Sequence, residues 1–324
     1  MAEEEKKPSV FAKIRKEYSN GRILTYFPLP FWIVQTKKTQ FLNWFRRFAV
    51  LAVKLLPVIA FIGIAMMVFQ VWLAGAGLLS VAQNPVPARL ASPRNILLLP
   101  GVNEFVPLSA GVLFALFLAM LLHELAHGIF ARVYDVKVKA VGFIIALVFP
   151  VAAFVDMDEE QLKKENWMKR VAVAAVGPYM NIFCGLLVFL SILVLIDFNF
   201  AGYGLLGFLI LLVLPIDPIL GNNLVPLHHL AIAYSGMSLY MHFVQFFFWF
   251  GWISLMLGIA NLIPVLPLDG GHVLHAVLER TMQAKAMKRF EKYNITATKV
   301  AAVIMLGIIA SYATTILWVA FFGS

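Results

Sequence analysis

The sequence of 324 residues is poor in charge. Only 13% of its residues are Asp, Glu, Lys or Arg, whereas 61% are hydrophobic and the mean hydropathy is +0.86. Soluble domains carry about 25% charged residues, so this composition excludes an ordinary water-soluble protein. The large apolar content also excludes intrinsic disorder. The fold class that remains is an α-helical polytopic membrane protein.

Cysteine is almost absent, because Cys184 is the only one in the chain. A single cysteine excludes an internal disulfide and a metal site built from thiolates, and we interpret Cys184 as a small apolar packing residue. The charged residues from Glu3 to Lys7 precede any apolar run, so we expect no cleavable signal peptide.

Long apolar stretches with few charges predict about six transmembrane helices. The predicted spans lie within residues 55–88, 106–132, 171–196, 237–262 and 300–322, and we interpret residues 198–236 as a broken or re-entrant excursion that returns to the outer side. This topology places 23 of the 26 Lys and Arg residues on the cytoplasmic side, as the positive-inside rule requires. We therefore expect a multi-pass protein of the cell membrane with a cytoplasmic N-terminus.

The net charge of +9 is concentrated near the N-terminus, where residues 1–47 hold ten of the cations. We divide the chain into this basic cytoplasmic or interfacial segment and a transmembrane domain of residues 48–324. Prolines and aromatic residues make residues 22–36 an interfacial segment rather than a span. The basic segment suits anionic lipid headgroups better than nucleic acid.

A polar cluster, His123-Glu124-Leu125-Ala126-His127, interrupts the second predicted span. Residues four apart lie on one helical face, so both imidazoles can reach one ion, and Glu124 can take a proton from water beside it. Such groups cost several kcal/mol in a membrane helix unless they are paired or bind a metal. The alternative is that Glu124 pairs with the histidines and lines a water-filled passage.

A zinc site needs a third protein ligand, and the best candidate is Asp269. It follows a proline-interrupted segment, precedes the pair Gly270-Gly271, and is the only acid between Pro218 and Leu278. A divalent cation would compensate this carboxylate directly. In the alternative interpretation, Asp269 forms a turn and caps the next helix.

These motifs resemble the site-2 protease family of intramembrane zinc metalloproteases, particularly archaeal members without a PDZ insertion. The resemblance rests on H-E-L-A-H in a membrane helix, N-L-I-P-V-L-P-L-D-G-G at residues 261–271, and Gly177-Pro178-Tyr179-Met180-Asn181 between them. It covers residues 106–280, which we take as the catalytic core. It implies one Zn²⁺ held by His123, His127 and Asp269, with Glu124 as general acid/base. It also implies hydrolysis of transmembrane protein substrates within the lipid bilayer.

The family further implies that Asn261 and Asn181 hold the substrate or the oxyanion. From the residues alone, Asn261 can instead bond the backbone freed by Pro264, and Asn181 can serve helix packing. Five other histidines are interpreted as non-ligands, although a supporting role for the first is open: His272, His275, His228, His229 and His242.

The loop between the second and third spans predicts a β-hairpin. Residues 136–155 are rich in β-branched and apolar residues, with Pro150 expected at the turn. An open strand edge must be buried in protein or line a cavity at membrane depth, where it can pair with an extended substrate. The resembling family implies such a role, and an apolar packing loop is the alternative.

Two other functions stay open at this stage. A transporter or metal-permeation protein could use the same polar residues as an ion path, and a protease-like scaffold could bind without cutting. His123 lies about 13 Å from the cytoplasmic end of its helix, because nine residues separate it from Arg132 at 1.5 Å each. Hydrolysis at that depth requires a polar channel to the cytoplasm.

Overall fold

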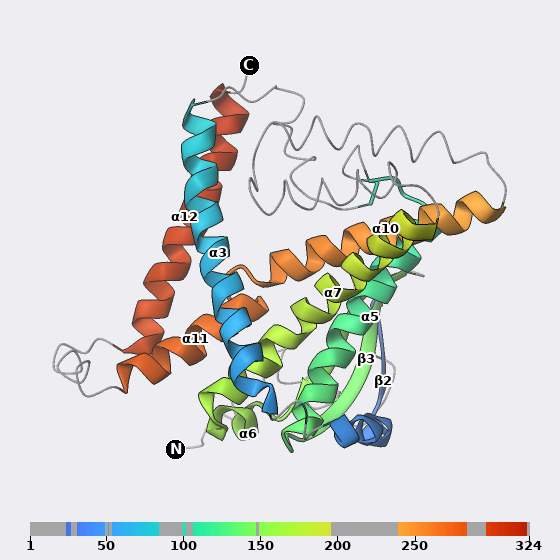
Figure 1. The fold of residues 1–324 in the computed structure, drawn as a ribbon, viewed down its shortest axis with the longest axis horizontal. Helices are drawn as coiled ribbons and strands as arrows, with labels where there is room; N and C mark the ends of the chain where they lie inside the picture. Colours follow the sequence, from blue (N-terminus) through green and yellow to red (C-terminus); the bar gives the residue numbers. More distant parts are fainter. Residues whose placement is uncertain are drawn as a thin grey trace, which may run out of the picture.

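A computed structural model of the chain describes residues 24–26, 31–48, 51, 54–83, 100–101, 106–146, 149–195, 239–283 and 296–322. These residues form a mostly helical structure with one small antiparallel sheet (Figure 1). The predicted excursion at residues 198–236 lies outside the described residues, as do His228 and His229.

The five longest helices coincide with the predicted spans: α3 (Leu56–Gln83), α5 (Ala110–Val133), α7 (Trp167–Leu195), α10 (Leu239–Asn261) and α12 (Ala297–Phe322). Among the described residues, Ala110–Val133 and Trp167–Ser191 are long and apolar enough to cross a membrane. The count of about six transmembrane helices stays a prediction.

Helices α5, α7 and α10 pack into one bundle, and glycines bring α7 and α10 close together (Figure 1). A Cβ at Gly185 would lie 2.5 Å from Leu255, and one at Gly258 would lie 2.8 Å from the carbonyl of Pro178. Helices α3 and α12 lie side by side next to this bundle. Their outer faces expose apolar side chains such as Phe61 and Val303, as lipid-facing helices do.

The sheet has four antiparallel strands in the order β1 (Leu24–Tyr26), β2 (Phe31–Thr36), β3 (Val138–Ala146) and β4 (Phe149–Met157). The predicted hairpin is therefore confirmed as β3 and β4. Pro150 lies within β4, opposite Ile145 at an irregularity in the register, rather than at the turn. The sequence did not predict β1 and β2. Strand β2 joins the hairpin by pairing with β3 about 110 positions further along the chain, and β1 joins the sheet only through β2.

Short elements fix the ends of the bundle. The 3-10 helix η1 (Thr39–Phe48) is held by Arg132, which donates to the Thr39 hydroxyl over 2.8 Å. Helix α6 (Glu159–Lys164) begins at Asp158, whose carboxylate accepts from the backbone of Gln161. Helix α11 (Asp269–Met282) packs against α7, and an ion pair between Arg170 and Glu279 joins them. This framework places the start of α11 beside the middle of α5.

Candidate metal centre

The two histidines of α5 face the same point, as their spacing predicts. Their Nε2 atoms lie 3.2 Å apart, and both side chains are about 5% exposed. The Nδ1 of His127 lies 2.6 Å from the carbonyl oxygen of Val173 on α7. Because a carbonyl only accepts, Nδ1 carries the proton and Nε2 presents a lone pair. His127 therefore has the tautomer that a metal ligand needs.

Asp269, the first residue of α11, comes from 146 positions further along the chain and meets both histidines. Its Oδ2 lies 3.0 Å from His123 Nε2, and its Oδ1 lies 3.4 Å from His127 Nε2. The interpretation of Asp269 as a helix cap is wrong, because Leu268 occupies the N-cap position and no side chain caps this helix. The carboxylate is thus directed at the histidines.

The glycine pair after Asp269 allows a close approach of two backbone segments. A Cβ at Gly270 would lie 2.2 Å from the carbonyl oxygen of Leu262, and one at Gly271 would lie 2.6 Å from the backbone of Leu266. Both residues have helical backbone conformations. Glycine is therefore required by the lack of room for a side chain and not by an unusual turn. Side chains at either position would push the start of α11, and Asp269 with it, away from the segment that follows α10.

The three ligand groups fit a zinc ion. A tetrahedral site with bonds of about 2.0–2.1 Å has ligand atoms about 3.3–3.4 Å apart. The 3.2 Å between the two Nε2 atoms is close to this edge length. The carboxylate of Asp269 lies at a similar distance from each ring, with Oδ2 3.0 Å from His123 Nε2 and Oδ1 3.4 Å from His127 Nε2. Two imidazoles and a carboxylate are also a donor set that zinc accepts in catalytic sites, with one position left for water.

Gly177 on α7 leaves the space in front of the two imidazoles open. A Cβ at this position would lie 2.3 Å from His127 Nε2 and 2.7 Å from His123 Nε2. An ion in contact with both nitrogens needs that space, so any side chain here would exclude it. Gly177 is therefore part of the site even though it offers no ligand atom.

The two predicted asparagines both lie beside His123. The amide of Asn181, which is fully buried, lies 3.2 Å from His123 Nδ1. The Nδ2 of Asn261 lies 3.5 Å from His123 Nε2, at the limit of hydrogen bonding. Asn181 therefore contacts the back of the ligand ring, whereas Asn261 lies on the side that faces Asp269.

Glu124 lies next to the two histidines that contact Asp269. Its carboxylate and the imidazole nitrogens all lie within 4.8 Å of one another. His123, Glu124 and His127 therefore form a group that could hold a metal ion, and Asp269 reaches both of its histidines. Strand β4 packs against α5 beside this group, where the side chain of Val155 lies close to Gly128.

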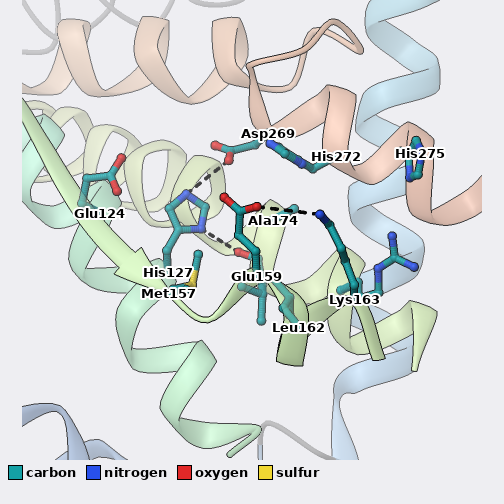
Figure 2. A pocket seen from close by; sticks show the side chains of 12 residues that line it. Glu124, His127, Met157, Glu159, Leu162, Lys163, Ala174, Asp269, His272 and His275 are labelled. Atoms are coloured by element: carbon teal, nitrogen blue, oxygen red, sulfur yellow. Dashed lines mark hydrogen bonds and ion pairs between the residues drawn. The ribbon is translucent and has the colours of Figure 1, made fainter. Parts of the chain in front are cut away.

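A cavity of about 260 Å³ runs from Glu124, His127 and Asp269 to helix α6 (Figure 2). Glu159, Leu162 and Lys163 of α6 line its outer part, where Glu159 and Lys163 form an exposed ion pair. The cavity therefore reaches from His127 and Asp269 to the end of the bundle where Glu159 and Lys163 lie. Sequence analysis predicted a channel but could not identify its walls.

The remaining described histidines do not join the two on α5. His272 lies on the cavity wall next to Asp269 (Figure 2), and desolvation lowers its pKa below the ordinary value. His275 contacts Glu279 over 3.3 Å and Thr298 over 3.4 Å. Both lie outside the group of side chains that could hold a metal, and the side chain of His242 is not described.

Two backbone features of the site were missed from the sequence: the carbonyl of Val173 and the open space at Gly177. Only Gly177 left a signal, since glycine in a helix interior is disfavoured and needs a reason. Backbone groups carry no signal in a single sequence.

Comparison with known proteins agrees with this geometry. Residues 111–308, more than half of the chain, match the model of peptidase family M50. The chain is 30% identical over 188 residues to "Zinc metalloprotease MJ0392" of Methanocaldococcus jannaschii, covering 58% of this chain and 37% of that protein. It is 27% identical over 228 residues to "Uncharacterized protein MJ0971" of the same organism, covering 56% of this chain and 61% of that protein.

The chain thus spans less than two thirds of the length of either relative. No solved structure matches it. The family match includes all three groups that converge in the metal centre, together with Glu124. The chain belongs to peptidase family M50, the site-2 protease family of membrane metalloproteases.

Proposed function

We propose that this protein is a zinc-dependent intramembrane endopeptidase that cuts transmembrane segments of other membrane proteins. The observation that carries the proposal is the convergence of His123, His127 and Asp269 within 3.0–3.4 Å of one another beside Glu124. These three residues would hold one zinc ion. Zinc, when bound, polarises a carbonyl and acidifies water.

The residues of the chain would divide the reaction between them. Glu124 takes a proton from the water that attacks the scissile carbonyl, and later gives a proton to the amine as the carbon–nitrogen bond breaks. Asn181 would orient the ring of His123 from behind by accepting from its Nδ1–H, with the amide turned so that its oxygen, which has no partner among the described residues, faces the ring. Asn261 lies near enough to the ligand nitrogens to donate to a substrate carbonyl oxygen.

The substrate is inferred from the setting of the site. The histidines lie in the middle of α5, one of the helices apolar enough to cross a membrane. A helical substrate must unwind before its carbonyls can be attacked, so segments with helix-weakening residues would be favoured. The unwound strand could pair with the free edge of β4, the last strand of the sheet.

The same proposal includes the topology expected from the charges. The protein would cross the cell membrane several times with residues 1–47 on the cytoplasmic side, and residues 48–324 would form the protease domain. The cavity toward α6 would then supply cytoplasmic water. A role in regulated intramembrane proteolysis follows if the cut releases a cytoplasmic fragment.

The test compares the purified wild type with Glu124→Gln on a single-span membrane substrate, together with measurement of bound zinc. We expect about one zinc per chain in both proteins, and cleavage in the wild type that is lost by about 10²–10⁴-fold in the variant. Equal cleavage in both would overturn the mechanism. Zinc binding without cleavage would favour a scaffold, and metal transport in vesicles would favour a permeation protein.

A further inference from the structure

A second cavity lies at the charged end of the bundle, apart from the two histidines of α5. Its volume is about 530 Å³, and pockets that take small ligands have volumes of about 300–1,000 Å³. The end of α6, the first turn of α7 and the end of α11 form its walls, and Figure 1 shows α6 beside the start of α7. Four cationic side chains line it: Lys163, Lys164, Arg170 and Arg280.

The acids that line this cavity are already bound to other side chains. Glu165 pairs with Lys169 over 2.9 Å, and Glu279 pairs with Arg170. Both carboxylates are therefore neutralised by cations that pack α7 against its neighbours, and neither is free to compensate a further cation in the cavity.

Two of the four cations consequently have no partner in the part of the chain that the structure describes. Lys163 pairs with Glu159 over 3.8 Å, but Lys164 and Arg280 take part in none of the ion pairs between described residues. Lys164 is the last residue of α6, and Arg280 lies in the last turn of α11. Uncompensated cations from two separate helices thus line one cavity, which favours an anionic ligand between them.

Helix α7 adds positive potential and an apolar wall to the same cavity. The helix is 29 residues long and has no acidic residue in its first turn, so the positive end of its dipole is uncompensated there. Trp167 and Met168 line the cavity and also pack on the buried apolar cluster that α3, α7, α11 and α12 share. The cavity is therefore cationic on one side and apolar where the long helices begin.

We propose that this cavity binds the phosphate of an anionic lipid headgroup in the cytoplasmic leaflet. The phosphate would lie between Lys164 and Arg280, and the acyl chains would continue past Trp167 along α7, which is apolar enough to cross a membrane from this residue onward. The inference rests on the topology within the proposed function, which puts this end of the bundle at the cytoplasmic surface. A bound lipid would tie α6 to α11, the helix that begins with Asp269.

The test measures binding of phosphatidylglycerol to the purified full chain in detergent micelles by native mass spectrometry. The double variant Lys164→Gln with Arg280→Gln removes both unpaired cations. Both residues are exposed, so the variant should fold and keep the zinc content of the wild type. We expect its affinity for phosphatidylglycerol to fall at least about tenfold. Unchanged affinity would overturn the proposal.

The matched control removes two other exposed lysines, through Lys38→Gln with Lys137→Gln. Neither residue lines the cavity, and neither takes part in an ion pair between described residues. The control has the same net charge as the test variant, so it should retain most of the affinity. Equal losses in the two double variants would overturn the proposal, because the attraction would then be to the overall charge and not to a site.

Two further ligands identify the source of the phosphate. Phosphatidylcholine carries a compensating cation and should bind more weakly than phosphatidylglycerol. Inorganic phosphate should compete only weakly, because it lacks the apolar part; if it binds as tightly as the lipid, the cavity takes free phosphate and the lipid assignment is wrong. Absent lipid binding in a wild type that cleaves its substrate would defeat this proposal alone. Specific lipid binding by an inactive wild type would defeat the proposed function alone.

Discussion

Replacing Gly177 with alanine should empty the metal centre while leaving every proposed ligand in place. The added Cβ would lie 2.3 Å from His127 Nε2 and 2.7 Å from His123 Nε2, although real Cβ contacts essentially never fall under 3.0 Å. Both imidazoles must therefore retreat. Zinc–ligand distances tolerate about 0.2 Å, so the retreat breaks the coordination. We expect zinc affinity to fall at least about a hundredfold, equivalent to about 2.7 kcal/mol.

The assay is zinc content of the purified protein, followed by competition with a chelator of known affinity. Gly185→Ala is the matched control, because its Cβ would lie 2.5 Å from Leu255 and disturb the packing of α7 on α10 about two helical turns from Gly177. Gly307→Ala is neutral, with nothing within 4 Å of its Cβ. Full zinc occupancy in Gly177→Ala would refute the assignment of this space to the ion. Equal zinc loss in Gly185→Ala would trace the effect to general packing.

Three further predictions concern the ligands and their supports. Asp269→Asn should weaken zinc binding and cleavage together, since the carboxylate contacts both imidazoles; unchanged zinc affinity would remove Asp269 from the ligand set. Asn181→Ala should lower zinc affinity about 10–100-fold by freeing the ring of His123, with cleavage recovering at high zinc concentration. Arg170→Met should destabilise the packing of α11 on α7 by about 1–2 kcal/mol, measured by thermal unfolding, and Glu279→Gln should add little in the double variant.

The sequence predicted the helices and the polar groups well for physical reasons. Hydropathy and the positions of cations mark membrane helices because lipid excludes charge, and the five longest helices overlap the predicted stretches to within four residues at the ends that extend beyond them. The spacing of His123 and His127 fixes their common face by helix geometry alone. Asp269 was identified because an isolated acid in an apolar stretch needs a partner.

What could not be predicted depends on contacts between distant segments. Strand β2 is part of the sheet only because it pairs with β3, and residues 22–36 alone show no more than an interfacial composition. The need for glycine at residues 270 and 271 has the same kind of origin, since it comes from the close approach of Leu262 and Leu266 in the preceding turn and not from the glycines' own dihedral angles.

The side chains of the site depend on a neighbouring helix, and no sequence motif shows this dependence. Helix α7 supplies no ligand, yet its Val173 carbonyl, Gly177 and Asn181 lie four residues apart on one face and act on His127, the ion space and His123 in turn. Strand β4 packs against α5 as well, where the side chain of Val155 lies close to Gly128. Changes in α7 should therefore alter metal affinity first, before they alter a rate measured at saturating zinc.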